Sequence, residues 1–171
     1  MTIHDQGNQA DSIRVSHEFN APRTLVFRAF SDAAMLARWW GPAGFTMKVQ
    51  YLDFRPGGHC LFQMENADTT MWARFVYGQI REPELIELTL SFSDENGGIC
   101  KAPFFEAWPL EMMNVFRFSE EQGKTRVENH CYPVHASEAE RAAFREQQRS
   151  VQDGLAAAMR VLEGLLAGTV L

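Results

Sequence analysis

Residues 137–167 read SEAERAAFREQQRSVQDGLAAAMRVLEGLLA, and this stretch decides the fold class. Ser137 and Glu140 have the S-x-x-E spacing of a capping box, in which each side chain accepts a hydrogen bond from a free backbone N–H group at a helix start. Behind them, apolar residues recur with helical spacing and form one stripe: Phe144, Val151, Leu155, Met159, Leu162 and Leu166. The pattern predicts a helix of about 30 residues whose apolar face must be buried.

The surface that buries this helix has to come from the preceding segment, where apolar residues recur at every second position. From Phe45 to Tyr132, short alternating runs are separated by turn signals. The clearest run is Ile86, Leu88, Leu90 and Phe92, which alternate with Glu87, Thr89 and Ser91. We expect roughly five or six strands here, in one curved antiparallel sheet with a solvated outer face.

The N-terminal part adds a strand and two short helices. Residues 13–19 read as a strand, and Asn20 is expected to cap a helix that runs to about Phe30. A second short helix ends at Trp40, because Gly41-Pro42 breaks it. The sequence therefore predicts an α+β domain in which a curved antiparallel sheet wraps around a long C-terminal helix.

Composition limits the class of protein. The 171 residues are 46% hydrophobic and 22% charged, which is typical of one soluble domain; we expect residues 1–11 to be a polar tail and residues 12–168 to fold. A net charge of -6 without a basic block argues against nucleic-acid binding. No apolar run is long enough for a membrane span, and the polar N-terminus does not resemble a signal peptide. The three cysteines form no C-x-x-C pair, so we expect reduced thiols in a cytoplasmic protein.

Short motifs along the chain carry a family resemblance: Phe19-Asn20-Ala21-Pro22, Trp39-Trp40-Gly41-Pro42, Asp53-Phe54-Arg55-Pro56-Gly57-Gly58, Trp108-Pro109-Leu110 and Gly123-Lys124-Thr125-Arg126. They resemble the SRPBCC (START/Bet v 1-like) superfamily, which has a helix-grip fold. Within it they are similar to the branch named after the activator of the heat-shock protein 90 ATPase, which includes calicheamicin-resistance-like proteins. The resemblance covers about residues 13–167 and implies an internal cavity between the sheet and the last helix.

The residues themselves also favour a cavity, because a strongly curved sheet closes around one helix only with many bulky side chains. Where the family usually carries Gly-Trp in the last helix, this chain has Gly154-Leu155, which leaves out an indole. An empty space there costs about 1 to 2 kcal/mol, so either neighbouring side chains or a ligand fill it. From strand alternation and helical phase, we expect the cavity to be lined by Phe62, Met64, Phe75, Tyr77, Leu88, Leu90, Phe92, Met112, Asn114, Phe116, Asn129, Gln148, Val151, Leu155 and Met159.

Three members of this set carry amides, which are costly to bury without a partner. Either Asn114, Asn129 and Gln148 orient a mostly apolar ligand, or the two asparagines bond each other and Gln148 is solvated. The segment 97–108 is long and apolar for a connection, which indicates a lid or a cover for a sheet edge or a dimer partner. The expected lid or entrance residues are Trp39, Trp40, Phe104, Phe105 and Trp108, with core packing as the alternative for the first two.

No residue set predicts catalysis or a metal site. His130, Cys131 and His135 lack zinc-site spacing, and Asp53, Arg55 and His59 are better explained as a salt-bridged turn. The first hypothesis is therefore a cofactor-free binding protein for a small hydrophobic molecule. Two alternatives stay open from the resemblance: a chaperone-associated stress-response protein, and a polyketide cyclase-like or self-sacrificing resistance enzyme. A homodimer is also left open.

Overall fold

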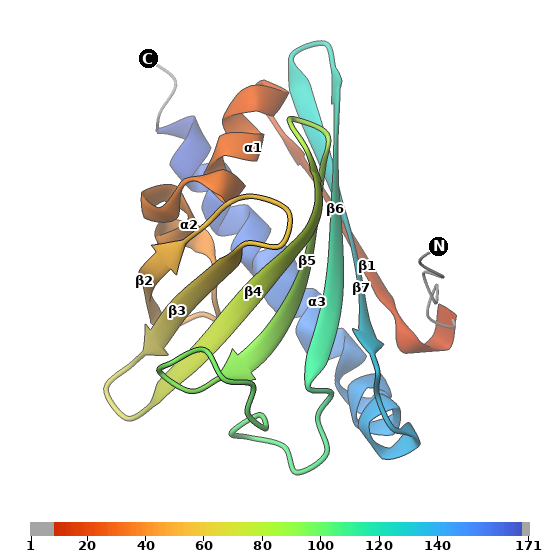
Figure 1. The fold of residues 1–171 in the computed structure, drawn as a ribbon. Coiled ribbons are helices and arrows are strands. Elements are labelled where there is room, and N and C mark those ends of the chain that lie inside the picture. The colour runs from red at the N-terminus through yellow and green to blue at the C-terminus, as the bar shows by residue number, and fades with distance from the viewer. Residues whose placement is uncertain (1–8, 169–171) are drawn as a thin grey trace.

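The computed structural model describes residues 9–168, which form one antiparallel sheet with helices on its inner face (Figure 1). The strands are β1 (Ile13–Phe19), β2 (Thr46–Leu52), β3 (His59–Glu65), β4 (Thr70–Arg81), β5 (Leu85–Ser93), β6 (Glu111–Glu121) and β7 (Lys124–Val134). The helices are the 3-10 turn η1 (Gln9–Asp11), α1 (Arg23–Ser31), α2 (Ala33–Trp39) and α3 (Glu138–Ala167).

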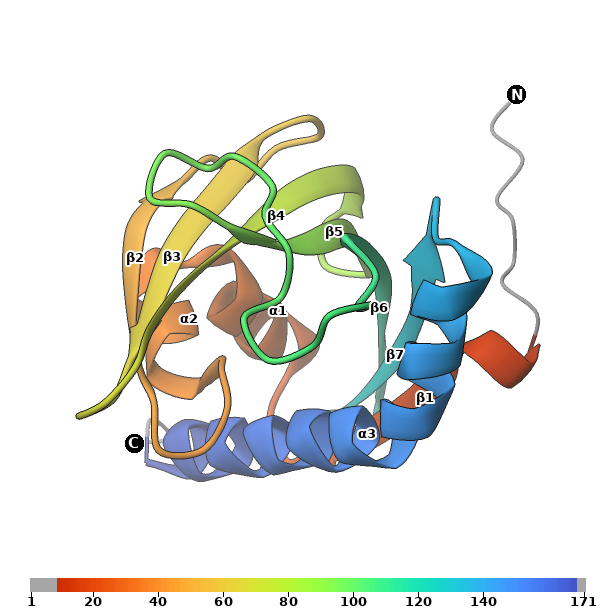
Figure 2. The same ribbon diagram turned by 90° about the horizontal axis from the view of Figure 1, so that it is seen from below.

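The sheet has seven strands in the order β1-β7-β6-β5-β4-β3-β2, and all neighbours pair antiparallel. Strands β2 to β7 form a meander that matches the upper end of the expected number, and β1 adds an edge next to β7. Figure 2 shows the sheet curving around α3. The predicted α+β helix-grip architecture is therefore confirmed.

Helix α3 begins at the predicted capping box. The Glu140 backbone N–H donates to Ser137 Oγ at 3.1 Å, and the Ser137 N–H donates to Glu140 Oε1 at 2.8 Å. In its second half, Met159, Leu162 and Leu166 are buried against the sheet, as the stripe predicts. None of the described helices is long and apolar enough to cross a membrane.

The starts of the two short helices depend on different contacts. Asp32 caps α2, because its Oδ1 accepts from the Met35 N–H at 3.0 Å. The prediction that Asn20 caps α1 is wrong: Pro22 occupies the cap position, and Glu120 of β6 accepts from the Arg23 N–H at 2.8 Å. A carboxylate at a helix N-terminus is stabilising whichever element supplies it.

The prediction that the outer face of the sheet is solvated is wrong at the end of strand β5. Ser91 and Ser93 are buried there, whereas Leu90 and Phe92 on the inner face are only half-buried. The chain after β5 turns back over the sheet, where Arg74 donates to the Gly97 carbonyl at 2.7 Å and the Cys100 N–H donates to the Phe92 carbonyl. At the end of β5, residues on the outer face are thus more buried than residues on the inner face, which is the reverse of the usual pattern.

The 3-10 turn η1, at the end of the expected polar tail, docks on α3. Asp11 is 6% exposed, and Arg145 donates to its carboxylate at 2.6 Å. Arg141 lies 3.7 Å from the same carboxylate. Residues 9–11 of the expected polar tail therefore belong to the fold, while residues 1–8 lie outside the described range.

We expect Gly58→Ala to destabilise the protein by about 2 kcal/mol or more, because the added Cβ would lie 2.0 Å from the Asp53 carbonyl oxygen. Urea unfolding measures the change. Gly164→Ala is the matched control: it lies on the exposed side of α3 with no atom within 4 Å of its Cβ, and should stabilise by up to about 1 kcal/mol. Equal urea midpoints for the Gly58→Ala variant and the unchanged protein would contradict the close approach of Gly58 to the Asp53 carbonyl.

Candidate functional site

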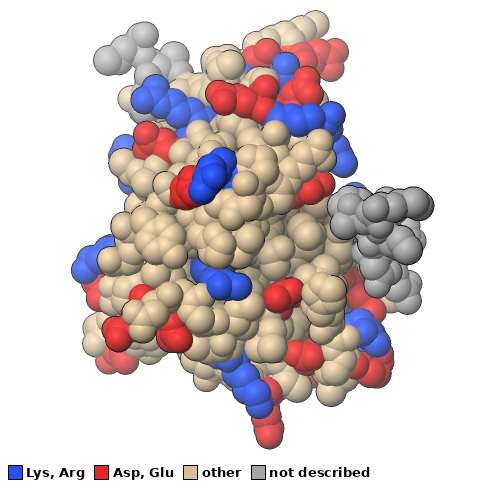
Figure 3. All heavy atoms as spheres, viewed as in Figure 1, with Lys and Arg blue, Asp and Glu red and all other residues tan. Residues whose placement is uncertain are grey.

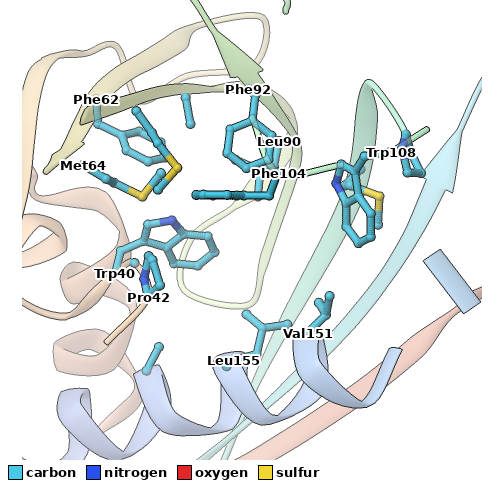
Figure 4. Close-up of a pocket in the computed structure, with 17 residues that line it drawn as sticks. Trp40, Pro42, Phe62, Met64, Leu90, Phe92, Phe104, Trp108, Val151 and Leu155 are labelled. Atoms are coloured by element: carbon cyan, nitrogen blue, oxygen red, sulfur yellow. The ribbon is translucent and has the colours of Figure 1, made fainter. Parts of the chain in front are cut away.

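A cavity of about 270 Å³, partly open to solvent, lies between the sheet and α3 (Figure 4). Its walls come from β3, β4, β5, β6 and α3, with the residues after α2 and the segment 94–110 closing the sides. The lining residues are Trp40, Gly41, Pro42, Phe62, Met64, Met71, Ala73, Leu90, Phe92, Phe104, Trp108, Pro109, Met112, Val151, Gly154, Leu155 and Ala158.

The cavity exists because the helix presents short side chains opposite the curved sheet. Val151, Leu155 and Ala158 face the sheet, and a Cβ built on Gly154 would have no heavy atom within 4 Å. In Figure 4, Leu155 and Val151 point up from α3 towards the aromatic wall. The missing indole at position 155 is therefore not replaced by another bulky residue on that helix turn.

Aromatic rings build the wall opposite the helix. Trp40 packs edge-on against Phe75 with ring centroids 5.1 Å apart, and Phe75 packs against Phe62 at 4.9 Å. Trp39 faces elsewhere: it is 3% exposed, and its Nε1 donates to the Ala29 carbonyl at 2.9 Å. Trp40 is thus a wall residue, and the alternative of core packing holds for Trp39.

The segment 94–110 crosses the open end between the sheet and α3 (Figure 2). Phe104 lines the cavity from this segment although 57% of its surface is exposed. Phe105 stacks on Trp108 at 5.1 Å, and Trp108 packs against Phe144 of α3 at 6.0 Å. Phe104 and Trp108 therefore belong to the wall, whereas Phe105 supports Trp108 from outside it.

Strand alternation identified part of the lining. Of the expected residues, the structure brings together Phe62, Met64, Leu90, Phe92, Met112, Val151 and Leu155 at the cavity. It places Phe75, Tyr77, Leu88, Phe116 and Met159 in the packed core next to the cavity. Sequence reasoning missed Met71, Ala73 and Ala158. The first two have the same strand parity as Phe75, which is the signal that identifies them.

The three amides do not converge on the cavity. Asn129 Nδ2 donates to Asn114 Oδ1 at 3.3 Å, so the two asparagines bond each other. Gln148 donates to the Ala10 carbonyl at 2.6 Å and to the Ser12 carbonyl at 3.3 Å, which ties the N-terminal segment to α3. The expectation that Gln148 lines the cavity is wrong, because it lies on the side of the helix that faces residues 10–12.

Titratable groups on the inner face are held neutral. Burial raises the pKa of the Cys60 and Cys131 thiols to about 12, and it also raises the pKa of the Tyr77 hydroxyl. No lining residue in the described part of the chain has a charged or titratable side chain; the indoles of Trp40 and Trp108 supply its side-chain N–H donors. The cavity can bind and orient a molecule by burial and shape, but its wall offers no acid, base or nucleophile.

Other polar groups form separate arrangements. No cluster suited to a metal ion occurs among residues 9–168, and His130 lies on the outer face while Cys131 is buried inside. Asp53 and Arg55 form an exposed ion pair at 2.7 Å, as the turn interpretation expects. A polar hollow of about 510 Å³ on the outer face is lined by both Arg and Glu, including the ion pair of Arg126 with Glu128. Figure 3 likewise shows acidic and basic side chains interspersed on the side seen in Figure 1.

The fold defines the class as a helix-grip domain of the SRPBCC type. The chain belongs to the family described as activator of Hsp90 ATPase homolog 1-like protein, whose model matches residues 20–167. The branch that includes calicheamicin-resistance-like proteins stays a prediction. No curated protein sequence matches the chain.

Solved structures share the architecture. A Mycobacterium smegmatis protein is 23% identical, with 94% of this chain and 93% of that chain covered and a TM-score of 0.76. An Arthrobacter aurescens protein is 22% identical with coverages of 97% and 91% and a TM-score of 0.78. A Staphylococcus epidermidis protein is 21% identical with coverages of 96% and 94% and a TM-score of 0.76. Likeness at these identities establishes the fold.

Burial predicts the order in which the thiols react. Cys100 is half-buried, whereas Cys60 and Cys131 are buried with a pKa of about 12, so a thiol reagent at neutral pH should modify Cys100 first. The other two should react only after unfolding, as followed by absorbance and mass spectrometry. Cys100→Ser removes the fast phase and serves as the control. Rapid modification of Cys60 in the native protein would contradict the packed inner face.

Proposed function

We propose that this protein binds a small hydrophobic molecule in the cavity between the sheet and α3. The observation that carries the proposal is a space of about 270 Å³ whose walls are aromatic, aliphatic or thioether side chains. Apolar pockets of this kind are the usual binding sites for small ligands, and thioethers adapt to ligand shape. The absence of titratable side chains from the described wall favours binding over chemical turnover.

Apolar burial is sufficient for useful affinity. A ligand that buries about 250 Å² of apolar surface gains about 6 kcal/mol at about 25 cal/mol per Å². Part of this is offset by the loss of free translation and rotation. Because about 6 kcal/mol corresponds to a dissociation constant of roughly 40 μM before this offset, we expect values of about 100 μM to the millimolar range for a molecule without polar contacts.

The segment 94–110 provides the route for entry. Phe104 contacts the cavity with one side and solvent with the other, so a movement of this segment would widen the opening. Its base is held by Arg74 at the Gly97 carbonyl and by the Asp94 carboxylate, which accepts from the Asn96 and Gly98 N–H groups. We propose that the part beyond Gly98 acts as the lid.

Leu155→Trp should close the cavity. The neutral dye N-phenyl-1-naphthylamine is expected to show a blue-shifted, enhanced emission with the unchanged protein, and at least a ten-fold weaker affinity with this variant because the indole fills the space. Fluorescence titration measures both, and thermal unfolding shows whether the variant remains folded.

Val161→Trp is the matched control for that experiment. It adds the same indole to α3 at a side chain that is 50% exposed and does not line the cavity, so dye affinity should stay unchanged. The absence of dye binding by the unchanged protein, or equal binding by the Leu155 variant, would overturn the proposal.

A chaperone-associated role is the second candidate, supported by the description of the matching family model. A pull-down with the cognate Hsp90 tests it, and recovery of the Leu155→Trp variant as efficiently as the unchanged protein would separate that role from ligand binding.

The polyketide enzyme and the homodimer stay predictions from the sequence. The three free cysteines support a reducing compartment, and we propose a cytoplasmic location on that ground.

A further inference from the structure

The wall of the cavity contains two hydrogen-bond donors that are not used within the fold. Trp40 and Trp108 both line the cavity, and neither indole N–H donates to any residue in the described part of the chain. Trp39 shows the contrast, because its Nε1 donates to the Ala29 carbonyl at 2.9 Å. Tryptophan N–H groups usually find a partner when they are buried. The two cavity indoles are therefore available to a bound molecule.

The two donors lie on different sides of the cavity. Trp40 directly follows α2, whereas Trp108 belongs to the segment 94–110 and packs against Phe144 of α3 at 6.0 Å. In Figure 4, the nitrogen of Trp108 lies on the ring edge that is turned towards the cavity. The nitrogen of Trp40 lies on the edge that is turned towards Phe104, another wall residue. A molecule in the cavity can thus meet an indole N–H on either side.

The same wall offers no strong acceptor. Its side chains between residues 40 and 158 are aromatic, aliphatic or thioether groups, so none of these lining side chains carries an oxygen atom. The sulfurs of Met64, Met71 and Met112 are weak acceptors. A hydroxyl or amine hydrogen of a ligand would therefore find no strong side-chain partner, whereas a ligand oxygen would find two donors.

Filling the cavity makes these donors matter for affinity. A molecule that occupies the space displaces water from the indole N–H groups, and a polar group buried without a partner is costly. A ligand oxygen replaces the lost partner, which is worth about two- to ten-fold in affinity for one neutral hydrogen bond. No cation lines the described wall, so an anionic oxygen would lose its hydration without gaining a counter-charge.

We infer that the cavity selects a neutral apolar molecule that carries a carbonyl or ether oxygen, to which the indole N–H of Trp40 or Trp108 donates. This inference rests on the proposed function and names the class of molecule that the cavity takes. The apolar body occupies the space between the aromatic wall and α3. The oxygen lies at the edge of that body, next to one of the two indoles.

Acetophenone and α-methylstyrene test the inference, because they have the same shape and differ only in a C=O group against a C=CH₂ group. NMR titration of the ¹⁵N-labelled protein at pH 7 gives the dissociation constant of each compound. The hydrocarbon is also the more hydrophobic of the two, so the quantity compared between protein variants is the ratio of the two constants. Benzoate, an anion of similar size, should bind at least ten-fold more weakly than acetophenone.

Removing the two indole N–H groups should weaken the binding of the ketone selectively. The double variant Trp40→Phe with Trp108→Phe keeps an aromatic ring on each side, and any widening of the cavity affects both compounds. The ratio of the acetophenone constant to the α-methylstyrene constant should rise about five-fold. Trp72→Phe is the matched control and should leave the ratio unchanged. Trp72 alternates along β4 with Met71 and Ala73, which line the cavity, and so lies on the other face.

The indole signals provide a measurement that needs no variant of the binding site. Each of the four tryptophans contributes one Nε1–H signal to the ¹⁵N NMR spectrum. The signal of Trp40 or Trp108 should move downfield with acetophenone more than with α-methylstyrene, because only the ketone accepts a hydrogen bond. The signal of Trp39, which already donates to the Ala29 carbonyl, is the internal reference and should differ little between the two compounds.

The outcomes separate the inference from the proposed function. If neither acetophenone nor α-methylstyrene binds the unchanged protein, both fail. If both bind but the ratio is the same in the double variant, or the Trp40 and Trp108 signals respond equally to the two compounds, the ligand site stands and the inference is overturned. Binding of benzoate as tight as that of acetophenone overturns the neutral class. If the double variant binds neither compound, the indole signals of the unchanged protein decide.

Discussion

Three helices have to cover the concave face of a seven-stranded sheet, and the rest of the structure follows from this constraint. Where α3 carries Met159, Leu162 and Leu166, α1 and α2 fill the space beside it and the core is packed. One to two turns earlier, at Val151, Gly154 and Leu155, the side chains are too short to reach the opposite wall. Close packing at one end of the helix and a cavity near its middle thus follow from side-chain size along the apolar stripe and from the position of α1 and α2 beside its C-terminal half.

The sequence was sufficient for the architecture because local patterns encode it. The capping box, the change of period from 3.6 to 2 and the Gly-Pro break are each properties of neighbouring residues. Contacts between distant segments were not visible in this way. Glu120, rather than Asn20, meets the start of α1, and Arg74 holds the chain after β5 over Ser91. Such partners depend on how the sheet curves, which periodicity does not describe.

The sequence predicted which residues of the candidate site face the inside of the sheet, but not which of them reach the cavity. Alternation shows that Phe62 and Tyr77 both point inward, yet only Phe62 reaches the cavity, because Tyr77 packs against Phe54 and Phe75 in the core. Strand parity places Ala73 on the inner face, but no pattern shows that the small size of Ala73 and Ala158 creates the space. The amide at position 148 has the helical phase of the apolar stripe, but it is close enough to residues 10–12 to bond their carbonyls instead.

Both halves of α3 bury apolar side chains, but the first half also carries most of the polar contacts to residues 10–12. Arg145 donates to Asp11 and Gln148 donates to the Ala10 carbonyl, beside the buried ring of Phe144, whereas Met159, Leu162 and Leu166 bury the last turns. High salt screens the charged contacts and leaves the apolar ones almost intact. Raising the salt concentration therefore weakens the attachment of residues 9–12 to α3, while Phe144 and the buried side chains of the last turns keep the helix on the domain.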